Sequence, residues 1–127
     1  MSLHLSGFLK KLDNFIREMI DTYPMYANEL ADGYAAFQLV RDANPFMILT
    51  LFNDHIAVPF YDQIINEDEE FIRTAAEGKL KTEFPQFYEF FEPCVNLWDT
   101  MSPESKEATW KHMKVLVVLS KKAVSNS

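Results

Sequence analysis

Side chains at positions 66–70 form the densest group in the chain that could bind a metal ion. An EF-hand calcium loop has oxygen ligands at positions 1, 3, 5 and 12 and a glycine at position 6. Counted from Asn66, all four ligand positions carry an oxygen donor, but position 6 is Phe71, which cannot form the sharp turn of a glycine. Four acidic residues also suit the positive first turn of a helix capped by Asn66. The run therefore predicts a solvated helix start and no metal site.

Three histidines and one cysteine are the other side chains with metal-ligating or nucleophilic potential. No two of His4, His55 and His112 are four residues apart, and none stands beside a cysteine, so there is no zinc motif. We expect His112 to lie on the surface among lysines, and His55 to form local hydrogen bonds near a helix end. Cys94 follows a proline on an aromatic stripe, which is typical of a small buried side chain.

Motifs for nucleophilic, acid–base or phosphate chemistry are missing from the sequence. Serines occur without a GxSxG pattern, and the three glycines are isolated rather than grouped in a phosphate-binding loop. Glu89 and Glu92 are three residues apart and share one helix edge, but paired carboxylates need a cleft for acid–base catalysis. We therefore expect no catalytic residue, no cofactor and no enzymatic activity.

The stretch from Leu97 to Trp110 carries the signals of a helix end, a tight turn and a new helix start. Ser102 is expected to be the N-cap and Pro103 the first helical residue, because the hydroxyl accepts a free backbone N–H and proline lacks one. Two helices joined this closely fold back on each other as an αα-hairpin. The hairpin should bury Trp98 and Trp110 next to each other across the turn.

Apolar residues recur at helical spacing in several segments of the chain. The predicted helices are 3–21, 25–41, 45–56, one that begins at Asn66, 79–101 and 103–122. A strand is the competing interpretation of 45–56, which is rich in β-branched and aromatic residues, and Val58-Pro59 should break the helical pattern.

These segments predict a single compact all-α domain over residues 1–127. It should contain five or six helices, end in the C-terminal αα-hairpin, and be frayed at 1–5 and 123–127. The absence of a linker longer than a turn favours one domain over two.

Two of the expected helices have more apolar surface than one core-facing stripe requires. Residues 45–56 begin at the cap Asn44-Pro45 and are nearly all apolar, and residues 113–119 are apolar on two sides. We expect one of them to contact a protein partner or a second copy. The candidate interface residues are Phe46, Leu49, Phe52, Val115, Val118 and Leu119.

The composition limits the classes of partner. A net charge of −7 disfavours binding to nucleic acid or to an anionic membrane, and no apolar stretch is long enough to span a bilayer. A single cysteine indicates a reducing, cytoplasmic setting. The sequence thus favours a non-enzymatic interaction or accessory protein. The alternative is a small-ligand-binding module or enzyme with an aromatic pocket between helices.

Three stretches also support a family resemblance. In order, they are Phe60-Tyr61-Asp62-Gln63-Ile64-Ile65 with the acidic turn and Phe71, then Leu97-Trp98, then Lys106-Glu107-Ala108-Thr109-Trp110-Lys111. This pattern resembles small uncharacterised helical proteins encoded by large DNA viruses of protists and algae, mainly over residues 60–120. The resemblance implies a viral protein in the host cell cytoplasm or the virion, and it brings no catalytic residue with it.

Overall fold

The computed structural model describes residues 3–70, 74, 78, 82 and 98–125. Within these residues the chain forms helices and turns and no strand, so the fold is all-helical. The elements are α1 (Leu3–Thr22), a short 3₁₀ turn η1 (Pro24–Tyr26), α2 (Ala27–Ala43), α3 (Pro45–Phe52), a π-helical turn η2 (Asn53–Ala57), α4 (Val58–Ile65) and α8 (Pro103–Ser125).

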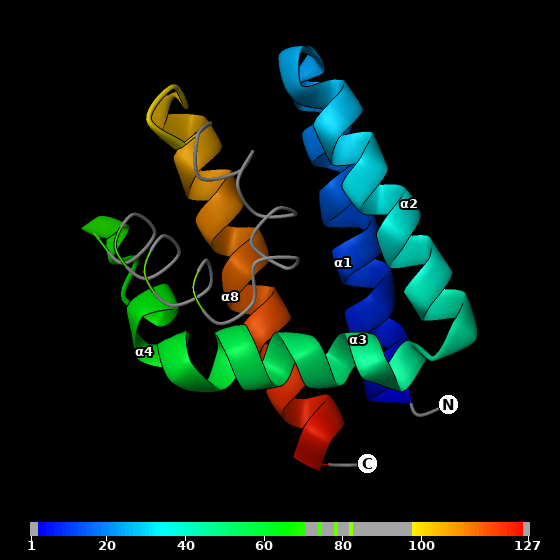
Figure 1. The fold of residues 1–127 in the computed structure, drawn as a ribbon. Helices are drawn as coiled ribbons and strands as arrows, with labels where there is room; N and C mark the ends of the chain where they lie inside the picture. The colour runs from blue at the N-terminus through cyan, green and yellow to red at the C-terminus, as the bar shows by residue number, and fades with distance from the viewer. Residues whose placement is uncertain (1–2, 71–73, 75–77, 79–81, 83–97, 126–127) are drawn as a thin grey trace.

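Helix α1 is the centre of the described part of the fold. It packs on α2 and on α8, which lie on its two sides, and α3 crosses its N-terminal half (Figure 1). The apolar residues of α1 recur at helical spacing, and its buried side chains are Leu5, Phe8, Leu9, Ile16 and Met19. The ring of Phe8 packs at a tilt of 57° on Phe52, with 5.1 Å between the ring centres. The main core therefore forms where α1, α3 and α8 meet.

A carboxylate on α1 holds α2 in place. The Tyr34 hydroxyl donates a hydrogen bond of 2.6 Å to Asp13, and Arg41 approaches the same oxygen at 3.2 Å. Arg17 binds the other oxygen of Asp13 at 3.0 Å. The hydrogen bond to Asp13, together with burial, raises the pKa of Tyr34 above its usual value of 10.0. Asp13 thereby joins two helices through groups twenty-one and twenty-eight residues away.

Residues 45–56 are helical, as predicted, and the strand interpretation is wrong. The side chain of Asn44 accepts a hydrogen bond of 3.3 Å from the Met47 backbone N–H, so Asn44 caps α3. The break expected at Val58-Pro59 is instead a kink. Helical structure continues through η2 into α4, and Phe60 alone departs from helical angles (φ −124°, ψ 18°). Pro59 lies in the first turn of α4, where a missing N–H is tolerated.

The acidic run is organised differently from the prediction. Asn66 ends α4, Glu67 has a positive φ of 54°, and the Asp68 carboxylate accepts a 3.1 Å hydrogen bond from the Glu70 backbone N–H. Asp68, and not Asn66, is therefore the N-cap of the helical turn that begins at Glu69. Two of the acidic side chains pair with lysines of α8, Glu67 with Lys114 and Glu69 with Lys106. The run thus connects the end of α4 to α8.

The turn before α8 follows the sequence signals. The Ser102 hydroxyl accepts a 3.2 Å hydrogen bond from the Ser105 N–H, and α8 begins at Pro103. Trp98 and Trp110 are both buried, and their rings meet edge to face with 5.2 Å between centres. The predicted burial and proximity of the two tryptophans are confirmed. The other arm of the expected hairpin, in 79–97, lies outside the described residues apart from Thr82.

The predicted fraying of residues 1–5 and 123–127 stays a prediction, although both ends of the described residues are helical. Helix α1 already begins at Leu3 and buries Leu5, while α8 extends to Ser125 and buries Ala123. Both ends are held because these side chains belong to the main core. Within the described residues, no helix combines the length and apolarity needed to cross a membrane.

Candidate functional site

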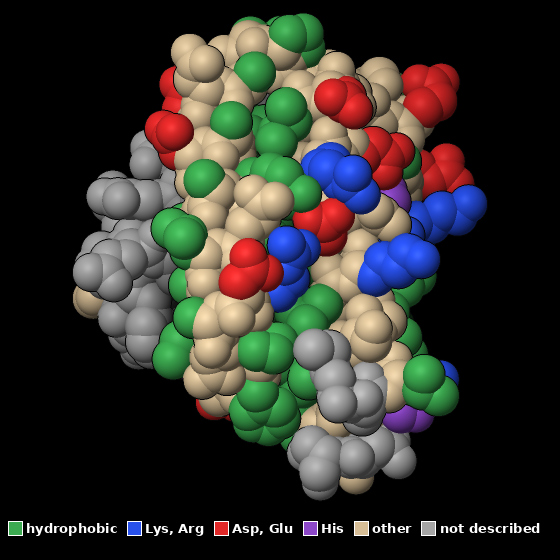
Figure 2. All heavy atoms as spheres, turned by 90° about the vertical axis from the view of Figure 1, so that its right-hand side faces the viewer, with side chains coloured by type: hydrophobic (Ala, Val, Ile, Leu, Met, Phe, Trp, Pro, Cys, Tyr) green, Lys and Arg blue, Asp and Glu red, His purple; other side chains and the backbone are tan. Residues whose placement is uncertain are grey.

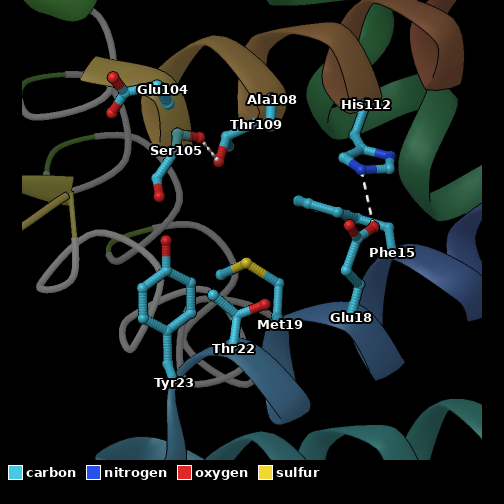
Figure 3. A pocket seen from close by; sticks show the side chains of 10 residues that line it. All are labelled: Phe15, Glu18, Met19, Thr22, Tyr23, Glu104, Ser105, Ala108, Thr109 and His112. Atoms are coloured by element: carbon cyan, nitrogen blue, oxygen red, sulfur yellow. Dashed lines mark hydrogen bonds and ion pairs between the residues drawn. The ribbon is translucent and has the colours of Figure 1, made fainter. Parts of the chain in front are cut away.

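A groove of about 230 Å³ lies between α1 and α8 (Figure 3). Five of its lining side chains come from the C-terminal half of α1 and the residue that follows it, and five come from the N-terminal half of α8. They are Phe15, Glu18, Met19, Thr22, Tyr23, Glu104, Ser105, Ala108, Thr109 and His112. Rings, hydroxyls and carboxylates therefore all line the groove.

His112 is the titratable side chain with the most constrained position in this groove. Its ring stacks on Phe15 with 4.9 Å between centres, and its Nε2 lies 2.9 Å from a carboxylate oxygen of Glu18. The ring is half-buried rather than fully on the surface, because α1 covers one side of it. Burial, followed by the nearby charge of Lys11, lowers the pKa of His112 below 6.5. Its Nδ1 is buried and finds no hydrogen-bond partner within 3–70 and 98–125, so the neutral ring donates from Nε2 to Glu18.

The groove does not assemble a nucleophile with this base. The Thr109 hydroxyl donates to the Ser105 backbone carbonyl at 2.9 Å, and the Ser105 hydroxyl lies 3.1 Å from that of Ser102. A Ser–His or Thr–His dyad needs the hydroxyl within hydrogen-bond reach of the imidazole. The hydroxyls of Ser105 and Thr109 instead stabilise the first turns of α8.

The six candidate interface residues do not form one surface. Leu49 and Phe52 are buried in the main core, because α3 turns that side toward α1. The structure thus leaves neither of these two side chains open to a partner. Phe46 is 47% exposed and Val115 is 42% exposed, while Val118 and Leu119 are half-buried. Leu119 also packs against the core, so Phe46, Val115 and Val118 are the accessible members of the set.

Helix α2 also exposes apolar side chains, at positions outside the six candidate interface residues. Leu39 is 73% exposed, and Ala36 and Ala43 are exposed on the same side of the helix. Beyond the Asn44-Pro45 turn, the first turn of α3 adds Phe46 and Met47, of which Met47 is 46% exposed. We call these five residues (Ala36, Leu39, Ala43, Phe46 and Met47) the α2–α3 surface. Figure 2 looks onto the side of the molecule that carries α2 and shows hydrophobic side chains open to solvent along it.

The spacing of the buried residues in α2 could have predicted which side of this helix is exposed. Leu30, Tyr34, Phe37 and Arg41 are the residues that face α1 or the core, at spacings of three and four. With that side fixed, Leu39 falls on the opposite side of the helix. Apolar spacing alone admits either Val40 or Leu39 to the buried stripe of this helix. The spacing of Leu30, Tyr34 and Phe37 decides between the two residues, because it places Val40 nearer the buried side. In the structure Val40 is half-buried and Leu39 is exposed.

A second exposed strip lies along α8. It consists of Lys111, Val115, Val118 and Lys122, and we call it the α8 surface. These positions follow one another at spacings of four, three and four and lie opposite the buried Leu116, Val117, Ser120 and Ala123. The strip combines an apolar centre with a lysine at each end.

Few of the residues that the structure describes could support metal binding or cysteine chemistry. No group of three or more His, Cys, Asp or Glu side chains comes together there in a way that could hold a metal ion. Two carboxylates of the acidic run are already paired with lysines. Cys94, Glu89 and Glu92 lie outside the described residues.

The chain was compared with known protein families, curated proteins and solved structures. No family model, no curated protein and no solved structure matches it. The resemblance to small helical viral proteins therefore stays a prediction, and function has to be argued from the surfaces and the groove.

Proposed function

We propose that this chain is a non-enzymatic interaction protein that acts through contacts with protein chains. The observation that carries the proposal is the α2–α3 surface, on which three large apolar side chains, Leu39, Phe46 and Met47, are 73%, 47% and 46% exposed. Single exposed apolar residues are ordinary, but a set gathered around one helix corner is typical of a binding surface. Burying these side chains against a partner would remove their apolar area from water.

The setting of this activity follows the sequence prediction. The surface belongs to a domain of five or six helices that ends in an αα-hairpin, and the protein works in the host cell cytoplasm or in the virion. A net charge of −7 favours protein partners over nucleic acid.

The test is affinity capture from the cells that naturally produce the chain, comparing wild type with Leu39→Glu. Val58→Glu is the matched control, because Val58 is 68% exposed at the start of α4, which lies on the opposite side of the molecule from α2 (Figure 1). We expect Leu39→Glu to reduce the bound partner at least about tenfold, or about 1.4 kcal/mol. Val58→Glu should bind as the wild type does. Equal capture by both variants would contradict the proposal.

The groove between α1 and α8 supports a second candidate function, binding of a small ligand. The observation that favours it is the stacked Phe15–His112 pair beside open space of about 230 Å³. Ala108→Trp would fill this space from α8. Loss of a small-molecule ligand in that variant, with protein capture unchanged, would favour the groove over the α2–α3 surface.

A further inference from the structure

The charged side chains that line the groove between α1 and α8 are acidic. Glu18 and Glu104 are both exposed there, and no lysine or arginine is among the described residues that line the groove. His112 also lines it, but burial lowers the pKa of this ring below 6.5, so the ring is neutral at pH 7. Lys11, whose charge also lowers that pKa, is not part of the lining. The lining therefore carries two negative charges.

The helix ends beside the groove do not change the sign of its charge. α1 ends at Thr22 and α8 begins at Pro103, and the groove is lined by residues from both ends, including Thr22 and Glu104. The C-terminus of a helix carries about −0.5 of an elementary charge and the N-terminus about +0.5. These two partial charges largely offset each other here. The two carboxylates therefore determine the charge of the groove.

The two carboxylates lie at opposite ends of the groove. The Glu18 carboxylate is 2.9 Å from Nε2 of His112, which fixes one end. Glu104 stands about 12 Å from His112 along the axis of α8, at a rise of about 1.5 Å per residue. Figure 3 shows Glu104 on one side and the Glu18–His112 pair on the other, with Met19 and Ala108 between them. The groove is therefore elongated, with a negative charge near each end.

The middle of the groove suits a hydrocarbon chain. Met19 of α1 is buried and Ala108 of α8 is exposed, and both line the groove. The small side chain of Ala108 leaves room above Met19, whose flexible thioether adapts to the shape of its neighbours. The Tyr23 ring lies on the same side of the groove as Glu104 (Figure 3), and aromatic rings attract ammonium groups.

We infer that this groove binds a linear organic cation with an amino group at each end, a member of the diamine and polyamine class. One ammonium group pairs with Glu18, the other pairs with Glu104, and the methylene chain lies over Met19 and Ala108. The inference rests on the second candidate function, binding of a small ligand in the groove, and specifies the chemical class of that ligand. An anionic or neutral chain of the same length would leave both carboxylates without a counterion.

The test is isothermal titration calorimetry of the full chain at low ionic strength with 1,8-diaminooctane. Two compounds of the same chain length, 1,8-octanediol and octanedioate, replace the amino groups with neutral and with negative groups. We expect the diamine to bind and the other two not to bind. Added salt should weaken the binding of the diamine, because salt screens interactions between exposed charges.

Four variants connect the binding to the groove. Glu104→Gln should weaken binding of the diamine by about two- to fivefold, the usual effect of one exposed ion pair, and the double variant with Glu18→Gln by about tenfold. Glu107→Gln is the matched control, because Glu107 is exposed on α8 but does not line the groove, and it should bind as the wild type does. Ala108→Trp should abolish binding by filling the space. Circular dichroism verifies that the helices persist in each variant.

Three results would overturn the inference. If the diol binds as well as the diamine, the groove takes a ligand regardless of charge, so the second candidate function stands and the proposed class of ligand is wrong. If Glu107→Gln weakens binding as much as Glu104→Gln does, the overall negative charge attracts the diamine and the groove does not. If none of the three compounds binds, the inference is wrong. Loss of a co-purified ligand in Ala108→Trp then still decides whether the groove binds a molecule of another class.

Discussion

At the residue scale, the tryptophan pair stabilises the junction between α8 and the segment before it. Trp98 and Trp110 are 2% and 4% exposed and meet edge to face, an arrangement that adds to the apolar area they bury. Lys106 lies 5.3 Å above the Trp98 ring and also binds Glu69. The indole N–H of Trp98, however, is buried and has no hydrogen-bond partner among the residues that the structure describes. Trp98 therefore acts through its rings and not through its polar atom.

Replacing Trp98 with alanine should lower the free energy of unfolding by about 3–5 kcal/mol, the usual cost of removing a large buried aromatic side chain. Trp98→Phe should cost distinctly less, because it keeps a ring against Trp110 and removes an N–H that none of the described residues accepts. Urea denaturation of the two variants measures both effects. Equal losses for Trp98→Ala and Trp98→Phe would show that the indole N–H has a role not explained by packing.

His112 should make stability depend on pH. Its pKa is lowered by burial in the folded chain, so below pH 6.5 the unfolded chain binds more protons at this residue than the folded chain does. The stability from the neutral ring is complete above pH 6.5 and is lost as the pH falls through the lowered pKa. We expect His112→Gln to flatten the decline in unfolding free energy between about pH 7 and about pH 5. Chemical denaturation at a series of pH values measures the difference from wild type.

Glu18→Gln provides the matched comparison for His112. The Glu18 carboxylate favours the protonated ring, so its removal should lower the pKa of His112 further and steepen the decline of stability toward acidic pH. A flatter decline in Glu18→Gln than in wild type would show that the Glu18 carboxylate, and not His112, controls the acid sensitivity.

Local signals identified some residues of these sites and missed others. Ser102 and Asn44 were predictable as caps because each is followed by a proline and accepts an N–H three residues ahead. The partner of His112 was not predictable, since Phe15 and Glu18 lie about ninety residues earlier in the chain and reach His112 only after α1 packs on α8.

At the element scale, α1 provides the contacts that bind α2 to the rest of the fold. The Asp13 carboxylate is only 13% exposed and interacts with Tyr34, Arg41 and Arg17. Helix and cap signals indicated where α1 and α2 lie, but no signal indicated this network. The N-cap in the acidic run could not be predicted either, because Asn66 and Asp68 are both residue types that cap helices well. The positive φ of Glu67 and the hydrogen bond to Asp68 decide between them.

Asp13→Ala should lower the free energy of unfolding by about 1.5–3 kcal/mol, because hydrogen bonds to a charged, mostly buried group are lost. Tyr34→Phe, which removes one of these bonds, should cost about 1 kcal/mol. Asp21→Ala on the exposed side of α1 is the control and should change stability by less than about 0.5 kcal/mol. Thermal or urea unfolding ranks the three variants, and an Asp13→Ala value no larger than that of Asp21→Ala would contradict the network.

At the scale of the whole molecule, the sequence predicted the all-helical class but not which helix sides face outward. Apolar content alone pointed to the helix after Asn44, yet Leu49 and Phe52 are buried because α3 crosses α1. The apolar content of α2 is lower, and Leu39 is nevertheless the most exposed large side chain of the α2–α3 surface. The choice between core and surface depends on which helices cross. Helix crossing is a property of the packed molecule and not of one segment.

The central claim is that the α2–α3 surface is covered when the protein acts. Hydroxyl-radical footprinting tests it directly, because an exposed methionine is readily oxidised to the sulfoxide. Met47 lies in the surface and Met25, which is 73% exposed, lies outside it in η1. In an extract of the cells that naturally produce the chain, we predict that Met47 oxidation falls several-fold relative to Met25, compared with dilute purified protein. An unchanged Met47-to-Met25 ratio in the two samples would contradict the claim.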